Sequence, residues 1–304
     1  MHLKSEKIMK NIGSFQELEK IADKENKKLY EVFQEIESLK LEKSTDQLRD
    51  LMEDHLKDME KSIKRGLESP HLSISGMSGM DSKKLSDRYE KNKSTPFNKL
   101  FGKILSYSIA VSEENQRMGK IVACPTAGSC GIVPAVIIAY SEEFNLSQEK
   151  LINSLFTAGG IGKFAAQEVP LSGAMAGCQA ECGVASTMAA GALVELMDGS
   201  NSMVINAAAL ALKNSLGLVC DPVAGLVEVP CIKRNGFYAI HAATAAEMAL
   251  AGIKSIIPMD EIIESMKQIG NLMPQSLKES SEGGLAITPT ACKITKNIQK
   301  LGFN

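Results

Sequence analysis

The chain has no tryptophan, and aromatic residues make up only 5% of its 304 residues. Its apolar stretches are interrupted by charged residues such as Glu195 and Lys213 before they reach the roughly 20 residues of a membrane-spanning helix. The formal net charge is −2, so nothing attracts the chain to nucleic acid or to an anionic membrane. No cationic, apolar leader opens the sequence. We therefore expect a cytoplasmic protein that binds neither nucleic acid nor membrane.

Cysteine, by contrast, is well represented, at positions 124, 130, 178, 182, 220, 231 and 292. In a reducing compartment disulfides are a poor explanation, which leaves burial, metal binding or catalysis. No paired C-x-x-C spacing indicates zinc. Cys220 and Cys231 flank a segment in which Pro222, Gly225 and Pro230 interrupt any regular helix. Such a segment can fold back and bring two distant thiols to one point.

A further thiol, Cys178, follows a run of small residues that begins at Ser172. Three thiolates that converge from separate loops can hold an iron–sulfur cluster, and three protein ligands leave one iron open for chemistry. Cys182 lies four residues after Cys178 and could share a helix face with it. The residues alone thus indicate an iron–sulfur site but leave its exact ligand set open.

We predict an all-α fold, a compact bundle of Ala- and Gly-rich helices with cysteine-bearing loops. Strand-like alternation is scarce, whereas residues 184–198, 203–219 and 239–256 are Ala-rich and long enough for buried helices. A last amphipathic helix should open at Pro258.

The first part of the chain is charged and has a helical pattern. Ser44 and Gln47 form a capping box ahead of a helix that should bury one apolar stripe: Leu48, Leu51, Met52, Leu56, Met59 and Ile63. We expect residues 1–69 to be an N-terminal amphipathic helical segment, packed on the body or on a partner subunit. Residues 70–304 should form the catalytic domain.

Loops of small residues lie outside these helices, at residues 73–81, 125–131 and 283–292. The first could bring backbone N–H groups near a carboxylate. The second should lead into a helix whose first N–H groups favour an anion. The third ends on a thiol, Cys292.

Two blocks carry a specific resemblance: Ser172-Gly-Ala-x-x-Gly-Cys178-Gln-Ala-Glu181-x-Gly183, and Cys220-Asp-Pro-Val-Ala-Gly-Leu-Val-Glu-Val-Pro-Cys231-x-Lys233-Arg234-Asn235. With the loops Gly76-Met-Ser-Gly79, Pro125-Thr-Ala-Gly128-Ser129 and Gly283-Gly-Leu-Ala, they resemble the α chain of the two-chain, iron–sulfur-dependent L-serine dehydratases. The resemblance covers residues 70–292, most of the chain.

The resemblance implies a [4Fe–4S] cluster held by Cys178, Cys220 and Cys231, whose open iron acts as a Lewis acid in converting L-serine to pyruvate and ammonia. Cys292 is a further candidate ligand, because some single-chain relatives end near this position in a cysteine that reaches the cluster. A monovalent cation is a second cofactor to consider. Amino-acid catabolism and gluconeogenesis are the implied cellular roles.

The same resemblance implies that Cys130 and Cys182 are buried bystanders, and we expect only burial for Cys124. Lys233, Arg234 and Asn235 directly follow a candidate ligand, and arginine holds carboxylates through a bidentate fork. They are candidate contacts for the serine carboxylate, although Lys233 and Arg234 could equally form a solvated patch.

Further substrate contacts are expected from the loops that resemble the family: Ser78, Thr126 and Ser129. Glu181, in an otherwise apolar run, needs a partner for its carboxylate and is a candidate catalytic residue. His241 is a weaker candidate, since a histidine in a helical core is more often satisfied by one hydrogen bond.

The His-Pro-Ser-Ser-Ser-His-Thr loop of the family does not occur in this chain. In two-chain members it lies on a β chain, so we expect a heterodimer in which that partner carries the general base and the other wall of the site.

Other functions remain open. A related iron–sulfur lyase such as an L-cysteine desulfidase would share the three thiols and differ in the pocket. A non-catalytic iron–sulfur sensor or scaffold would normally supply four ligands. A pyridoxal-phosphate enzyme is disfavoured, because it would leave the thiols unexplained.

Overall fold

The computed structural model describes residues 12–91 and 95–300. Within these ranges the protein consists of helices and connecting loops without a β-strand, so the predicted all-α fold is confirmed. The α-helices are α2 (Phe15–Glu25), α3 (Leu29–Leu41), α4 (Thr45–Glu68), α5 (Asp81–Lys91), α6 (Lys99–Gln116), α7 (Ile132–Phe144), α8 (Gln148–Glu168), α9 (Gly173–Ala176), α10 (Val184–Leu196), α11 (Asn201–Lys213), α12 (Cys231–Leu250), α13 (Met259–Leu272) and α14 (Pro289–Lys300). None of these helices is long and apolar enough to cross a membrane.

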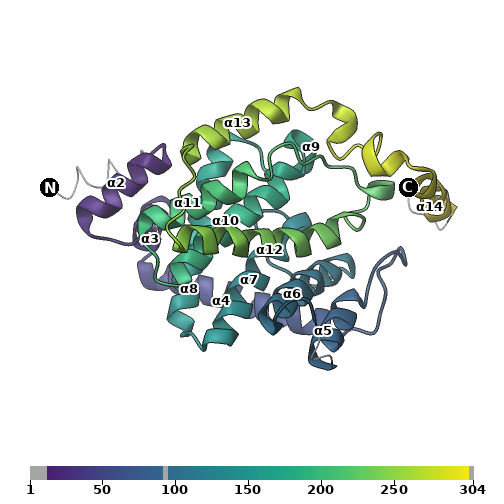
Figure 1. Cartoon of the computed structure of the whole chain (residues 1–304), viewed down its shortest axis with the longest axis horizontal. Coiled ribbons are helices and arrows are strands. Elements are labelled where there is room, and N and C mark those ends of the chain that lie inside the picture. Colours follow the sequence, from purple (N-terminus) through teal and green to yellow (C-terminus); the bar gives the residue numbers. More distant parts are fainter. Residues whose placement is uncertain (1–11, 92–94, 301–304) are drawn as a thin grey trace.

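The core is built around α10, every residue of which is buried. Helices α7, α8, α11 and α12 pack around it, and α2 and α14 lie at opposite ends of the long axis (Figure 1). Small residues allow the close packing: a Cβ added at Gly191 would lie 2.3 Å from Cδ1 of Ile161 on α8. This explains why a chain with few aromatic residues can still form an extensive core.

The N-terminal helices share this core. Phe15 and Phe33 pack against Phe164 of α8, with ring centroids 5.4 and 5.8 Å apart. Ser44 caps α4 and makes the reciprocal hydrogen bonds of a capping box with Gln47, as predicted.

The apolar stripe of α4 differs from its prediction at one position. Leu48, Leu56, Met59 and Ile63 are buried, whereas Leu51 is 46% exposed because it lies at the edge of the buried face. The helix otherwise packs on α6, α8 and α7 through the predicted side.

Two helix boundaries also differ from those predicted. Helix α11 ends at Lys213 rather than at 219, and α12 begins at Cys231 rather than at 239. Its first turns contain few alanines and therefore escaped a composition-based prediction, but Pro230 at the N-cap suits a helix start. As a consequence Cys231 and His241 lie on one helix.

The segment between α11 and α12 is not a regular helix, in agreement with its prolines and glycine. It contains only a short 3₁₀ turn, Val223–Gly225, and it folds back so that the N–H of Val223 donates to the carbonyl of Val229 at 2.9 Å. The expected loop up to Cys292 is only partly correct, since Pro289 starts α14 and Cys292 lies within that helix.

Candidate metal centre

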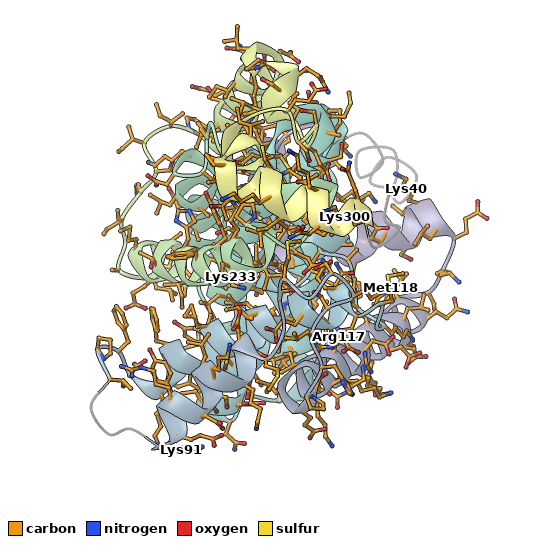
Figure 2. All side chains as sticks on the ribbon, turned by 90° about the vertical axis from the view of Figure 1, so that its right-hand side faces the viewer. Lys40, Lys91, Arg117, Met118, Lys233 and Lys300 are labelled. Carbon is orange, nitrogen blue, oxygen red and sulfur yellow. The ribbon has the colours of Figure 1, made fainter. Side chains whose placement is uncertain are left out.

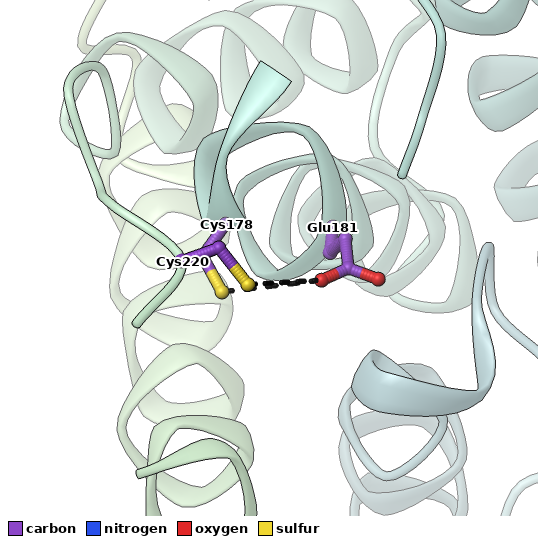
Figure 3. Close-up of side chains that lie close together, drawn as sticks. All are labelled: Cys178, Glu181 and Cys220. Atoms are coloured by element: carbon purple, nitrogen blue, oxygen red, sulfur yellow. Dashed lines mark hydrogen bonds between the residues drawn. The ribbon is translucent and has the colours of Figure 1, made fainter. Parts of the chain in front are cut away.

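Two of the predicted cysteine ligands meet at a buried point. The Sγ atoms of Cys178 and Cys220 and a carboxylate oxygen of Glu181 lie within 4.8 Å of one another (Figure 3). Cys178 directly precedes a π-turn, Gln179–Gly183, that leads into α10, and Cys220 makes an isolated parallel bridge with Lys278. Both cysteines are 2% exposed.

The third predicted ligand, Cys231, is the first residue of α12 and is also buried. It lies outside the 4.8 Å group found among the described residues. Burial, followed by the negative charge of Cys178, raises the pKa of its thiol. Cys231 therefore lies near enough to Cys178 for the two charges to interact.

Cys182, expected to be a bystander, lies beside the group. A hydrogen bond to Cys178 raises its pKa well above the ordinary value, and burial and the charge of Cys178 act in the same direction. The four-residue spacing of the two cysteines was the signal for this contact. Cys182 thus belongs to the immediate surroundings of the centre.

Arg234 contacts the thiol group directly. Its Nη1 donates to Sγ of Cys178 at 3.5 Å and to the carbonyl of Val219 at 2.9 Å, while Nη2 donates to Oδ1 of Asp221 at 2.9 Å. The hydrogen bonds from Cys182 and Cys220 and the charge of Arg234 outweigh burial and hold the pKa of Cys178 well below its usual range. A thiolate is the form that a metal ligand requires.

Glu181 faces the two thiols from the other side. Its Oε1 accepts a hydrogen bond from the Thr126 hydroxyl at 2.9 Å, and its Oε2 is 3.9 Å from Sγ of Cys178 and 4.0 Å from Sγ of Cys220. Burial and the negative charge of Cys178 raise its pKa to about 7. Glu181 therefore has the partner that the sequence required, and near neutral pH it can hold or release a proton.

Glycines allow the backbone to come close to this group. A Cβ added at Gly173 would lie 2.7 Å from both Sγ of Cys220 and Oε2 of Glu181, and one at Gly128 would lie 3.5 Å from Oε1 of Glu181. Thiolates are the ligands of iron–sulfur clusters and of soft metals. The two thiols and the carboxylate that meet here are donors that suit such a metal centre.

The C-terminal loop holds the segment of Cys220 in place. The N–H of Cys220 donates to the carbonyl of Leu277 at 2.9 Å, and the N–H of Leu285 donates to Oδ2 of Asp221 at 2.8 Å. Gly284 has φ +57°, and a Cβ there would lie 2.5 Å from Oδ2 of Asp221. A glycine is thus required at position 284 by its positive φ and its close approach to Asp221.

Asn235 ties α12 to the loop of residues 125–131. It is fully buried, its Nδ2 donates to the carbonyl of Gly128 at 2.8 Å, and its Oδ1 accepts from the N–H of Gly131 at 2.9 Å. Ser129, also buried, donates to the carbonyl of Cys124 at 3.1 Å. Both side chains are engaged by backbone groups.

Lys233, labelled in Figure 2, is half-exposed and pairs with Asp81 at 2.7 Å. Ser78 is buried and donates to Glu228 at 2.5 Å. Arg234, in contrast to the solvated alternative, is mostly buried. Sequence reasoning did not identify Glu228, although a carboxylate between valines in an apolar run is the kind of signal that drew attention to Glu181.

The remaining candidates lie apart from the thiols. His241 is roughly 15 Å along α12 from Cys231, by the helical rise, and its Nε2 is 2.8 Å from the carbonyl of Ala211. Cys292 is exposed on α14 and donates to the carbonyl of Ile287 at 3.6 Å. Cys124 and Cys130 are buried as expected, and burial raises the pKa of Cys124 to about 12.

Comparison with known proteins agrees with the resemblance. The chain matches the family described as "Serine dehydratase alpha chain" over residues 24–286. It is 47% identical over 257 residues to the "Probable L-serine dehydratase, alpha chain" of Bacillus subtilis (strain 168), covering 84% of this chain and 85% of that protein. The chain belongs to the serine dehydratase alpha chain family.

Two other relatives show the range of the family. The "L-serine dehydratase, alpha chain" of Peptoniphilus asaccharolyticus is 45% identical over 200 residues, covering 66% of this chain and 68% of that protein. An L-serine dehydratase of Escherichia coli (strain K12) is 45% identical over 184 residues, which cover 60% of this chain but only 40% of that protein.

Proposed function

We propose that this chain is the α subunit of an L-serine dehydratase that forms pyruvate and ammonia. The observation that carries the proposal is the convergence of the Cys178 and Cys220 thiols with Glu181, inside a chain whose relatives are named L-serine dehydratases. We propose Cys178, Cys220 and Cys231 as the ligands of a [4Fe–4S] cluster. Cys231 is proposed as the third because it is buried in the first turn of α12, the turn whose Arg234 hydrogen-bonds Cys178.

Bound there, the cluster supplies an open iron that acts as a Lewis acid on the hydroxyl and carboxylate groups of serine. The chain's own residues prepare that place. Arg234 favours the thiolate form of Cys178, and Gly173, which has no side chain, lets the backbone approach Cys220 and Glu181 closely. Glu181 keeps a titratable carboxyl with a pKa of about 7 beside the thiols.

Thr126 is the substrate contact that the geometry supports best in this chain. Its hydroxyl donates to Glu181 at the edge of the thiol group. Ser78, Ser129 and Asn235 hydrogen-bond Glu228 and backbone carbonyls instead of Glu181, and Arg234 is held by Cys178 and Asp221. We propose that these four support the site rather than bind serine.

A β chain is the proposed partner. Relatives that cover most of this chain are named alpha chains, and this sequence lacks the family's His- and Ser-rich loop. We propose that the β chain brings that loop and the general base to the thiol site, in a cytoplasmic heterodimer.

The test is anaerobic co-purification with the β chain, followed by iron and sulfide analysis and by pyruvate assays with L-serine. We expect Cys178→Ser, Cys220→Ser and Cys231→Ser to lose their iron. Their rate of pyruvate formation should fall at least about 100-fold. Cys124→Ser, a buried cysteine that serves as the control, should keep both. Serine turnover that survives the three ligand substitutions would refute the assignment.

The same preparation separates the alternatives. Release of sulfide from L-cysteine in preference to pyruvate from L-serine would identify a desulfidase. A stable cluster without turnover of either amino acid would indicate a sensor or scaffold.

A further inference from the structure

Glu228 is a buried carboxylate surrounded by three serine hydroxyls. Its side chain is 3% exposed, Ser78 and Ser73 donate to Oε2 at 2.5 and 2.7 Å, and Ser75 donates to Oε1 at 2.7 Å. Burying a carboxylate is costly unless hydrogen bonds compensate for the lost water. The three serines supply that compensation from a single loop about 150 residues away.

The loop is shaped to present these hydroxyls to one point. The N–H of Ser73 donates to the carbonyl of Ser78 at 2.8 Å, which closes the loop at its base. Gly76 has φ +75°, and Gly79 has φ +127° with no room for a Cβ beside Leu72. Residues 73–79 therefore form a closed turn whose serines face Glu228.

On its other side, the segment that carries Glu228 lies near the loop of residues 125–131, whose Thr126 hydrogen-bonds Glu181. The carbonyl of Val227 accepts a hydrogen bond from Nε2 of Gln116 at 2.6 Å. The Cγ1 atom of Val227 would lie 3.3 Å from a Cβ placed at Gly128, and that Cβ would lie 3.5 Å from Oε1 of Glu181. The carbonyl of Glu228 accepts from the N–H of Ile232 at 3.0 Å, in the first turn of α12. The position of Glu228 is therefore coupled to that of Cys231.

A second contact joins the same two regions. Asp81, at the start of α5, pairs with Lys233 of α12 at 2.7 Å, and its N–H donates to Oε1 of Glu113 at 2.8 Å. The chain just after the loop is thus tied to the first turn of α12, in addition to the bonds of the loop with Glu228.

We propose that Glu228 is a positioning residue. Together with Ser73, Ser75 and Ser78 it forms a clasp, which holds residues 73–79 against residues 226–231 and sets where Cys231 stands relative to Cys178 and Cys220. The effect on a cluster rests on the proposed function, whereas the clasp itself does not.

The test compares Glu228→Gln with Glu195→Gln, by hydrogen–deuterium exchange of the iron-free protein and by iron release to a chelator after reconstitution. Glu195 is a suitable control because it is also buried and also accepts a hydrogen bond from a hydroxyl group, that of Thr157 at 3.3 Å. It lies near the C-terminal end of α10. We expect Glu228→Gln to raise exchange on the order of tenfold in both residues 73–79 and residues 226–232. Iron release should quicken, and the visible circular dichroism of the cluster should change.

The control should show neither effect. Exchange that rises in only one of the two segments, or in neither, would refute the clasp. Faster exchange with unchanged iron release and unchanged dichroism would refute the positioning of Cys231. If the wild-type chain takes up no iron, the proposed function fails while exchange still decides the clasp. Should Glu228→Gln not fold, Ser75→Ala, which leaves two hydroxyls in place, tests the same coupling with an expected rise of about threefold.

Discussion

Arg234 contacts or adjoins all three segments that carry the proposed ligands. It lies in the first turn of α12 after Cys231, hydrogen-bonds Cys178, and binds the carbonyl of Val219, the residue before Cys220. Its planar guanidinium can bond in several directions at once, which the ammonium of lysine does not match. Arg234 therefore couples the three segments as well as favouring the thiolate of Cys178.

Replacing Arg234 should disrupt both stability and metal binding. Arg234→Gln leaves Asp221 buried without its cation, so we expect a loss of about 3–5 kcal/mol in the free energy of unfolding. Lys233→Gln, the neighbouring control, breaks a half-exposed pair and should cost less than about 1 kcal/mol. Urea denaturation of the iron-free protein measures both. An equal loss in the free energy of unfolding for the two variants would contradict the proposal that Arg234 couples the three segments.

Glu195 should make stability depend on pH. Burial raises its pKa to about 7, against the effects of Lys28 and of the Thr157 hydroxyl, while Asp198 and Glu31 add to the rise. Between the pKa that Glu195 has in the unfolded chain and pH 7, the folded protein therefore binds more protons at this residue than the unfolded chain does. Stability should fall as pH rises through this window, by up to about 1.4 kcal/mol per pH unit.

The measurement is the difference in the free energy of unfolding between the wild type and Glu195→Gln, followed from about pH 4.5 to about pH 7.5. The glutamine variant removes the titration, so its stability should fall less steeply as pH rises. Parallel pH profiles would show that Glu195 titrates normally.

At the scale of elements, the packing of α3 on α8 depends on one glycine of a pair. A Cβ at Gly160 would lie 2.2 Å from the ring of Phe33, whereas Gly159 has open space around it. We expect Gly160→Ala to destabilise the protein by about 1–3 kcal/mol through overpacking. Gly159→Ala should be neutral or stabilising by up to about 1 kcal/mol, because alanine favours the helix.

Thermal or urea unfolding of the two alanine variants decides this point. The two substitutions are chemically identical and adjacent, so a difference between them reports only the contact with α3. Similar midpoints would mean that α3 can move away from α8 at little cost.

At the scale of the molecule, residues 15–68 and the rest of the chain bury one continuous core. Helices α3 and α4 pack on α8 and α6, and Phe33 inserts beside Gly160. We expect a chain of residues 70–304 alone to lose cooperative unfolding, because the absence of α2–α4 would expose this apolar surface to water.

Circular dichroism during thermal unfolding tests the truncated chain, with the full chain as the control. A sharp transition in both would show that residues 70–304 form an independent domain, as the sequence suggested.

Features that depend on neighbouring residues could be predicted from the sequence. The capping box at Ser44 and the broken backbone around Pro222 follow from local hydrogen bonding and from fixed φ angles. The all-α class follows from helical periodicity, and the choice of candidate thiols follows from a resemblance that spans most of the chain.

Contacts between side chains from distant segments became known from the three-dimensional structure. It placed Arg234 on Cys178 and Asp221, and it placed the serines of residues 73–79 on Glu228. The physical reason is that backbone conformation depends on adjacent residues, whereas a buried hydrogen bond between distant segments depends on how whole helices pack. For residues more than a few helical turns apart, spacing along the chain does not predict which side chains meet, whereas for Cys178 and Cys182 it did.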